Sequence, residues 1–135
     1  MKNSEDLQDY VLEQLINRSK DKYGGTRAMA LKSLSYFKNN LEVKNEIRNE
    51  FVFLLHNDPE SEVRMSAIKQ LDYEDVKNLD HFLQRTRDTD PNVRKLAYSA
   101  LQKQKFESLN NEQKITILRG EKNKKNIKIK NKIIK

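Results

Sequence analysis

The sequence predicts an all-α protein: a short α-solenoid of about three helix-hairpin repeats, followed by a basic tail that we expect to be disordered. Three observations predict this fold. The 135 residues include only three glycines and two prolines, and β-branched residues do not alternate with others before the tail. One four-position template occurs three times, and an amphipathic segment precedes each copy. A helix hairpin repeated along the chain accounts for both features.

The template spaces four residues at fixed intervals. An Arg follows an Asp by six positions, and an Ala and a Leu follow that Arg by three and by seven. The three copies are Asp21, Arg27, Ala30, Leu34; Asp58, Arg64, Ala67, Leu71; and Asp88, Arg94, Ala97, Leu101. A charged cluster that recurs in this way indicates architecture rather than a single site.

The second helix of each hairpin is predicted from its apolar stripe. The third copy places apolar residues at i, i+3, i+4, i+7 and i+8, namely Val93, Leu96, Ala97, Ala100 and Leu101. The second copy has Ser66 and Gln70 on that stripe, and Ile68 is expected to compensate from the flank.

The starts of these second helices are marked by different residues. Asp90-Pro91 and Asp58-Pro59 each place an N-cap acceptor before a proline at the first helical position. The first copy has Gly24-Gly25 instead, which predicts a looser turn.

The first helix of each hairpin is predicted from a second set of apolar positions: Leu7, Val11, Leu12, Leu15, Ile16; then Ile47, Phe51, Leu54, Leu55; then Val76, Leu79, Phe82, Leu83. The repeats are expected at about 5–38, 43–72 and 75–104. A further helix is expected at 110–119, capped by Ser108 or Asn110, with Ile115 and Leu118 on its inner face. Residues 1–119 would form one helical-repeat domain, and 120–135 the tail.

The charge of the chain is concentrated in the tail. Of the formal charge of +7, residues 1–119 contribute only +1, from 20 Lys and Arg against 19 Asp and Glu, and residues 120–135 contribute +6. The tail is a Lys/Asn/Ile-rich low-complexity segment, interpreted as a disordered extension; the alternative is a basic arm that contacts phosphates.

Several classes of function are disfavoured by what the sequence lacks. There is no cysteine, and His56 and His81 are isolated, so we expect no metal and no cofactor. No Gly-rich phosphate loop, Ser/His/Asp set or convincing carboxylate pair appears, so we expect no enzymatic activity and no small-molecule substrate. No apolar window reaches the length of a membrane span and the N-terminus lacks a signal-peptide core, so we expect an intracellular protein without membrane contact.

The repeated Asp and Arg are predicted to form an inter-repeat ladder. Equivalent turns come into register in a solenoid, so the Arg of one repeat can reach the Asp of its neighbour. The residues of this ladder are Asp21, Arg27, Asp58, Arg64, Asp88 and Arg94.

Other basic residues near the third turn lie outside the predicted ladder. Arg85, Arg87 and Lys95 are interpreted either as a solvated helix end or as contacts to DNA phosphates, and Lys103 and Lys105 extend the second possibility. Tyr98 is a weak candidate for base stacking because it borders the buried stripe. If these cations share one concave face, DNA binding is favoured.

The third copy carries the whole pattern D-x-D-P-x-V-R-x-x-A-x-x-A-L, which resembles the inner turn of HEAT repeats. Beyond generic HEAT, the chain resembles the CAP-G family of condensin subunits over roughly residues 15–119. The family's R-T-[KR]-D element and V-R-K-x-A-Y are matched by Arg85, Thr86, Arg87, Asp88, Val93, Arg94, Lys95, Ala97 and Tyr98. Its next helix is matched loosely by Ser108, Gln113, Lys114, Ile115 and Leu118.

This resemblance implies a non-catalytic HEAT-repeat scaffold in mitotic chromosome condensation. Such a subunit would bind the kleisin subunit of condensin and the backbone of double-stranded DNA, would meet other condensin subunits indirectly, and would be nuclear and chromosomal. The family is many times longer and its pattern stops here at Gly120, so we expect a fragment or truncated form. The alternative is a generic HEAT-repeat protein–protein adaptor without a nucleic-acid role.

Overall fold

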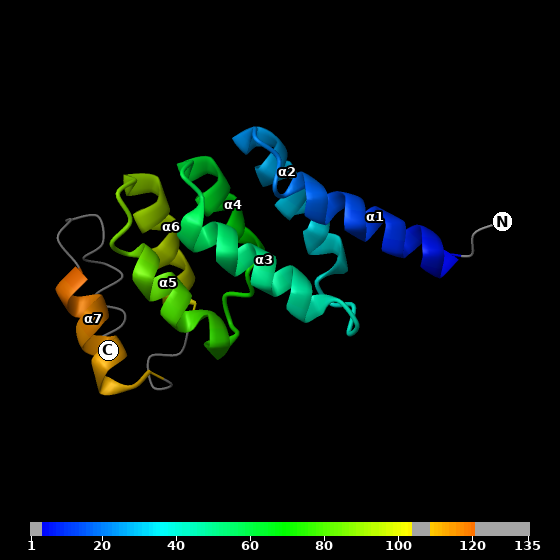
Figure 1. Cartoon of the computed structure of the whole chain (residues 1–135). Helices are drawn as coiled ribbons and strands as arrows, with labels where there is room; N and C mark the ends of the chain where they lie inside the picture. Colours follow the sequence, from blue (N-terminus) through cyan, green and yellow to red (C-terminus); the bar gives the residue numbers. More distant parts are fainter. Residues whose placement is uncertain (1–3, 104–108, 121–135) are drawn as a thin grey trace. The chain divides into compact units, whose positions relative to one another are not determined.

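The computed structural model describes residues 4–103 and 109–120, and its elements in these ranges are helical (Figure 1). The α-helices are α1 Ser4–Arg18, α2 Gly24–Leu34, α3 Lys44–Asn57, α4 Ser61–Gln70, α5 Leu79–Arg85, α6 Pro91–Gln102 and α7 Asn111–Gly120. Two 3₁₀ turns, η1 Ser35–Phe37 and η2 Val76–Asn78, lie in the connections. The chain divides into two compact units, Met1–Gln70 and Leu71–Lys135, which we describe separately.

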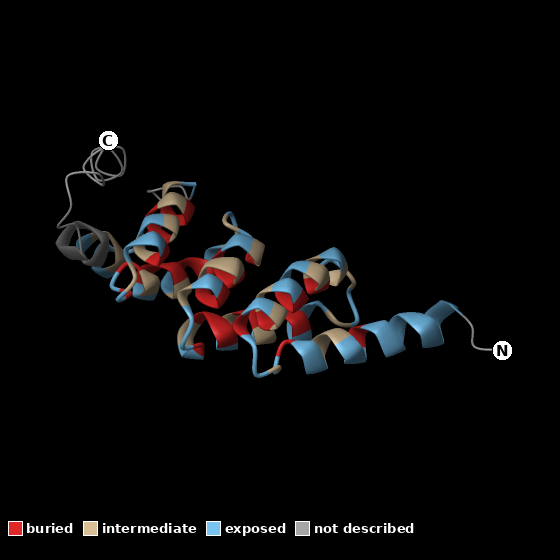
Figure 2. Cartoon of the chain, turned by 90° about the horizontal axis from the view of Figure 1, so that it is seen from above, coloured by how far each residue is buried: buried red, intermediate tan, exposed pale blue. Residues whose placement is uncertain are grey.

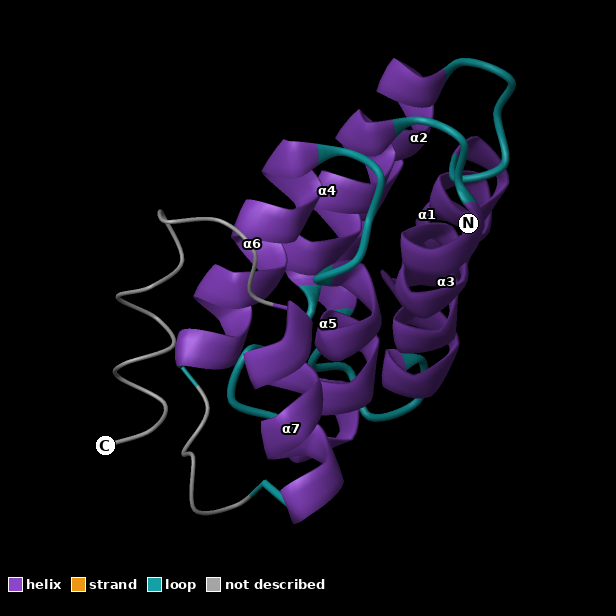
Figure 3. Ribbon diagram, turned by 90° about the vertical axis from the view of Figure 1, so that its left-hand side faces the viewer, coloured by secondary structure: helices purple, strands orange, loops and turns teal. Residues whose placement is uncertain are grey.

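The first unit contains two helix hairpins that share one core. Helix α2 packs against both α1 and α4, and α3 packs against α4. In Figure 3, α2 and α4 lie side by side on one side of this unit, and α1 and α3 on the other. The fully buried side chains include Leu31, Leu34, Ile47, Phe51, Leu55, Val63, Ala67 and Ile68. Ile68 therefore does fill the core where the second copy of the template is polar.

The second unit is built on the hairpin of α5 and α6, and α7 also packs against α5. Its core includes Leu79, Phe82, Leu83, Val93, Ala97, Tyr98, Ala100 and Leu101. Tyr98 is 1% exposed, so it is a core residue and unavailable for base stacking. Leu96, predicted on the buried stripe, is only half-buried because the stripe is centred on Ala97 and Tyr98.

Three residues predicted to be in the core are exposed instead. Leu7 and Val11 are 53% and 42% exposed, because α2 covers only the later part of α1, where Leu12 is buried. Val76 is 57% exposed because it lies in η2, and α5 begins only at Leu79. The apolar spacing predicted the helices correctly, but not how far the neighbouring helix extends.

The helix starts confirm one predicted cap and correct another. The Asp90 carboxylate accepts hydrogen bonds from the backbone N–H groups of Asn92 and Val93, at 2.8 and 3.1 Å, and Pro91 opens α6. Asp58 is not an N-cap, because α4 begins three residues later at Ser61. Gly24 and Gly25 do not form a loose turn: they are the first two residues of α2.

Helix α7 begins with a reciprocal pair of hydrogen bonds. The Asn110 side chain accepts from the backbone N–H of Gln113 at 2.7 Å, and the Gln113 side chain accepts from the backbone N–H of Asn110 at 3.0 Å. This capping box confirms Asn110 as a cap. Ile115 was predicted on the inner face but is 46% exposed. Ser108, the side chain of Leu118 and residues 121–135 lie outside the described residues.

The second unit contains an aromatic pair, Tyr73 and Phe82. The rings of Tyr73 and Phe82 meet edge to face with centroids 5.7 Å apart, and the Lys103 ammonium lies 4.7 Å from the centre of the Tyr73 ring. Burial raises the pKa of the Tyr73 hydroxyl above its ordinary value of 10.0, because the phenolate loses hydration there.

Tyr73 should therefore ionise at a higher pH than an ordinary tyrosine. The folded state holds the hydroxyl proton more tightly than the unfolded chain does. The resulting contribution to the free energy of unfolding is present below pH 10 and is lost as the pH rises through the raised folded-state pKa. In a titration followed by tyrosinate absorbance, Tyr73→Phe should remove a component that titrates above pH 10. Removal of a component at or below pH 10 would contradict the burial of this hydroxyl.

Candidate protein and nucleic-acid interface

Each hairpin contains the same corner between its two helices. The template Asp lies three residues before the second helix, and the template Arg is the fourth residue of that helix. In all three copies the Arg Nη1 donates to the backbone carbonyl of the Asp six residues earlier. The pairs are Arg27 to Asp21 at 2.8 Å, Arg64 to Asp58 at 2.9 Å and Arg94 to Asp88 at 2.8 Å. This bond explains the six-residue spacing in the sequence.

The side chain of the template Asp also stabilises this corner. Its Oδ1 accepts a hydrogen bond from the backbone N–H two residues later, which makes an Asx turn. The three bonds run from Tyr23 to Asp21 at 2.9 Å, from Glu60 to Asp58 at 3.0 Å and from Asp90 to Asp88 at 2.9 Å. The carbonyl and the carboxylate of each Asp are therefore both used in shaping the turn.

A similar corner, with an asparagine in place of the arginine, follows α4. The backbone carbonyl of Asp72 accepts from Nδ2 of Asn78 at 3.0 Å, and the Asp72 side chain accepts from the backbone N–H of Glu74 at 3.0 Å. Asn78 is 2% exposed. This role of Asn78 was not predicted from the sequence, although its position six residues after an Asp was a usable signal.

One ion pair of the predicted ladder, called a rung below, joins the two hairpins of the first unit. Arg27 donates to the Asp58 carboxylate through Nε at 2.7 Å and through Nη2 at 2.9 Å, and the two side chains are only 11% and 2% exposed. The hydrogen bond to Asp58 raises the pKa of Arg27 above its ordinary value, against the opposing effect of burial. The rest of the predicted ladder stays a prediction.

Arg85 has a structural partner that was not predicted. Its Nη1 lies 3.1 Å from Oδ2 of Asp88, and its side chain is 20% exposed. The two residues are three apart at the end of α5, a spacing at which charged side chains meet, so the pair could have been inferred from the sequence. Arg85 therefore belongs to the corner of the third hairpin and is less available to phosphates than Arg87.

The other candidate cations are distributed over the second unit. Arg87 and Lys95 are exposed, and the exposed Lys103 lies over Tyr73. Lys105 lies outside the described residues. Arg85 and Arg87 line a common pocket, whereas Lys95 and Lys103 are not among its lining residues. Of the four predicted phosphate contacts that lie in the described residues, the structure therefore brings Arg85 and Arg87 to one site.

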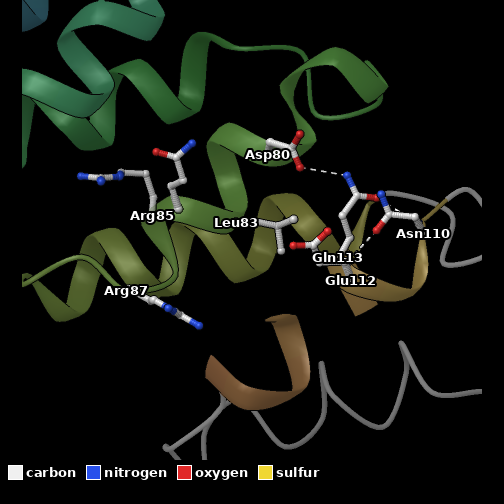
Figure 4. Close-up of a pocket in the computed structure, with 8 residues that line it drawn as sticks. Asp80, Leu83, Arg85, Arg87, Asn110, Glu112 and Gln113 are labelled. Atoms are coloured by element: carbon white, nitrogen blue, oxygen red, sulfur yellow. Dashed lines mark hydrogen bonds between the residues drawn. The ribbon is translucent and has the colours of Figure 1, made fainter. Parts of the chain in front are cut away.

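This pocket lies between α5 and the start of α7 and has a volume of about 620 Å³ (Figure 4). It is lined by Asp80, Leu83, Gln84, Arg85, Arg87, Asn110, Glu112 and Gln113. The side chain of Gln113 donates to Asp80 at 2.8 Å across one side. The lining includes two arginines and two carboxylates, and Arg85 is already paired with Asp88, outside the pocket.

Two further properties concern the described residues alone. Within 4–103 and 109–120, no group of three or more His, Cys, Asp or Glu side chains is arranged to hold a metal ion. Across the same residues, no helix combines the length and the apolar character that a membrane crossing requires.

Paired helices, an arginine in each corner and a buried rung between hairpins define a HEAT-type α-solenoid. The sequence is 34% identical over 96 residues to condensin complex subunit 3 of Schizosaccharomyces pombe, and 31% identical over 97 residues to that of Xenopus laevis. These matches cover 70% and 72% of the chain. The chain is thus a relative of condensin complex subunit 3, and the resemblance seen in the sequence is confirmed.

The solved structures agree with the sequence matches. The chain superposes, with a TM-score of 0.75 and 25% identity over 98% of its length, on a chain of the crystal structure of the S. pombe condensin Cnd3–Cnd2 subcomplex. It spans 11% and 9% of the two curated relatives and 18% of the crystallised chain. No protein-family model matches the sequence.

The buried rung should contribute strongly to stability. Arg27→Leu leaves the Asp58 carboxylate buried without its partner, so we expect a loss of about 3 kcal/mol or more in the free energy of unfolding, measured by urea titration of the full chain. The control is Arg18→Leu, which removes an exposed arginine at the end of α1 and should cost about 0.5 kcal/mol or less. Equal losses in the two variants would show that the Arg27–Asp58 pair contributes no more to the free energy of unfolding than an exposed arginine does.

Proposed function

We propose that the chain is a non-catalytic HEAT-repeat scaffold of a condensin complex, which binds the kleisin subunit and the backbone of double-stranded DNA. The observation that supports this most directly is the similarity to condensin complex subunit 3 over 70% of the chain, together with the fold match to a chain of the S. pombe Cnd3–Cnd2 subcomplex. The proposal places the protein on chromosomes in the nucleus, where other condensin subunits would be reached through the kleisin.

A scaffold role is supported by what the charged residues do. In the corners, the carbonyl of each template Asp accepts from an arginine and its carboxylate shapes the turn, so these groups hold helices rather than face a substrate. Arg27 and Asp58 are nearly buried, and they are hydrogen-bonded to one another and to the backbone of their own corners. Recognition would therefore depend on exposed surface between and beside the corners.

Kleisin binding is supported by the structural relative. The chain that this protein matches was crystallised as a subcomplex of Cnd3 with Cnd2, and we propose that a kleisin corresponding to Cnd2 binds here. Extended peptides suit helical repeats because successive hairpins offer a continuous row of side chains.

DNA binding would rest on the exposed cations of the second unit. Arg87 and Lys95 are exposed and can approach phosphate oxygens, and we propose Lys103 and Lys105 as additional contacts. Arg85 would act mainly through its pair with Asp88, by fixing the end of α5 beside Arg87. Such contacts are independent of base sequence.

A protein–protein adaptor without a nucleic-acid role is the second candidate. Residues 1–119 carry a net charge of only +1, and Arg85 is already paired with a carboxylate. Both observations reduce the electrostatic attraction that a DNA-binding surface requires.

The kleisin interaction can be tested by pull-down. The recombinant 135-residue chain should retain S. pombe Cnd2 or the kleisin of its own organism at physiological salt. An unrelated acidic protein serves as the control partner. Failure to retain either kleisin at low salt would refute the condensin scaffold proposal.

The DNA interaction needs a test that separates the body from the basic tail. In a background with the seven lysines of 122–135 changed to glutamine, Arg87→Glu with Lys95→Glu should weaken binding to a DNA duplex. The slope of log K against log salt should fall by about 2, because each phosphate that is no longer neutralised lowers it by roughly 0.9.

The matched control for that pair is Lys32→Glu with Lys69→Glu, which makes the same charge change at exposed positions of the first unit. Equal effects of the two pairs would mean that DNA responds only to net charge. That result, or no binding once the tail is neutral, would favour the adaptor.

A further inference from the structure

The N-terminus of α2 lacks the stabilising groups that the other described helices have. Its N-cap residue, Tyr23, makes no side-chain hydrogen bond to the helix, and the first turn of the helix contains no acidic residue. Each of the other six described α-helices has an acidic residue in its first turn or a side-chain cap. The first N–H groups of a helix carry partial positive charge. The positive end of α2 can therefore be stabilised only by a negative charge from another element.

The Glu60 side chain of the next hairpin lies against this end of α2. A Cβ atom placed on Gly24 would overlap with the Glu60 carboxylate, so the carboxylate lies directly beside the first residue of α2. A Cβ atom on Gly25 would meet no atom within 4 Å. Oε1 of Glu60 also lies 3.9 Å from Nη2 of Arg27. Glycine at position 24 thus leaves the space that the carboxylate occupies.

The backbone of Glu60 is held by the corner of its own hairpin. Its N–H group donates to Oδ1 of Asp58 at 3.0 Å. Its carbonyl accepts from the N–H groups of Val63 and Arg64, both at 3.2 Å, where α4 begins. Glu60 therefore starts one helix with its backbone, while its side chain reaches the start of a helix in the preceding hairpin.

Helix α2 carries most of the packing between the two hairpins of the first unit. It packs against α4 as well as α1, whereas α1 is exposed along most of its length (Figure 2). Arg27 is the fourth residue of α2, so fraying of the first turn would also move Arg27 away from Asp58. The stability of this one turn therefore affects how firmly the first hairpin is attached to the second.

We infer that the Glu60 carboxylate acts as an inter-hairpin cap, which stabilises the first turn of α2 and thereby controls local opening of the first hairpin. The interaction is electrostatic, because a negative charge lies at the positive end of the helix dipole. The Glu60 side chain is 51% exposed, so water can replace this contact far more easily than it can replace the buried Arg27–Asp58 pair. This inference does not rest on the proposed condensin role.

Amide hydrogen exchange of the 135-residue chain, followed by mass spectrometry, measures the local opening of α2. Glu60→Gln removes the charge and keeps the size of the side chain. It should raise the exchange rates of peptides that cover α2 about two- to fivefold, the change that corresponds to the usual effect of one charge at a helix N-terminus. In about 1 M salt the difference from the wild type should largely disappear, because the charge is screened.

Three further variants make the result specific to this contact. Glu62→Gln removes an exposed carboxylate from the first turn of α4 and should leave the exchange of α2 unchanged. Gly24→Ala displaces the Glu60 carboxylate and should raise the exchange of α2 as Glu60→Gln does. Gly25→Ala adds the same methyl group in open space and should not raise it. In the Gly24→Ala chain, Glu60→Gln should have little further effect.

Three results would overturn the inference. The first is an equal rate of α2 exchange in the wild type and in Glu60→Gln. The second is an equal increase in Glu60→Gln and Glu62→Gln, because the effect would then report the overall stability of the chain. The third is full additivity of Gly24→Ala and Glu60→Gln, which is the behaviour of sites that do not interact.

Discussion

The structure depends on how an arginine and an aspartate share the corner of each helix hairpin. A turn between helices leaves backbone carbonyls and N–H groups that need partners when they are covered. Arg27 supplies three of its donors at once: one to the carbonyl of its own corner and two to the Asp58 carboxylate of the next. Because both charges are nearly buried, neither can lose the other without a large desolvation cost, and this fixes the two hairpins of the first unit in register.

The helices and the corners could be predicted from the sequence because both are local patterns. Arg94 lies where its spacing from Asp88 required, and Val93 and Ala97 are fully buried as their periodicity indicated. Periodicity identifies the apolar face of a helix but not the length of its neighbour, and for that reason Leu7 and Val11 were expected in the core.

The candidate site was less predictable from sequence than the fold. From the sequence, Arg85 is interpreted either as part of a solvated helix end or as a contact to DNA phosphates, although its three-residue distance from Asp88 also allowed an ion pair. Only the packing at the end of α5 decides among these interpretations. Asn78 was missed because an amide in place of an arginine does not match a charge template. Asp58 was expected to cap α4, but the position of a helix start within a short turn is set by tertiary packing.

The assignment of the arginines to the corners determines which surface remains for partners. The repeated charged residues of the described corners serve the architecture of the chain, which is a relative of condensin complex subunit 3. Arg87 and Lys95 offer exposed positive charge on the second unit.

The central claim is that the Arg27–Asp58 pair is a structural bond between hairpins. A double-mutant cycle measures it most directly, from the unfolding free energies of the wild type, Arg27→Leu, Asp58→Asn and the double variant. We expect a coupling free energy of about 2 kcal/mol, since the two residues contact one another through two buried hydrogen bonds. A coupling below about 0.5 kcal/mol, the value typical of independent sites, would contradict it.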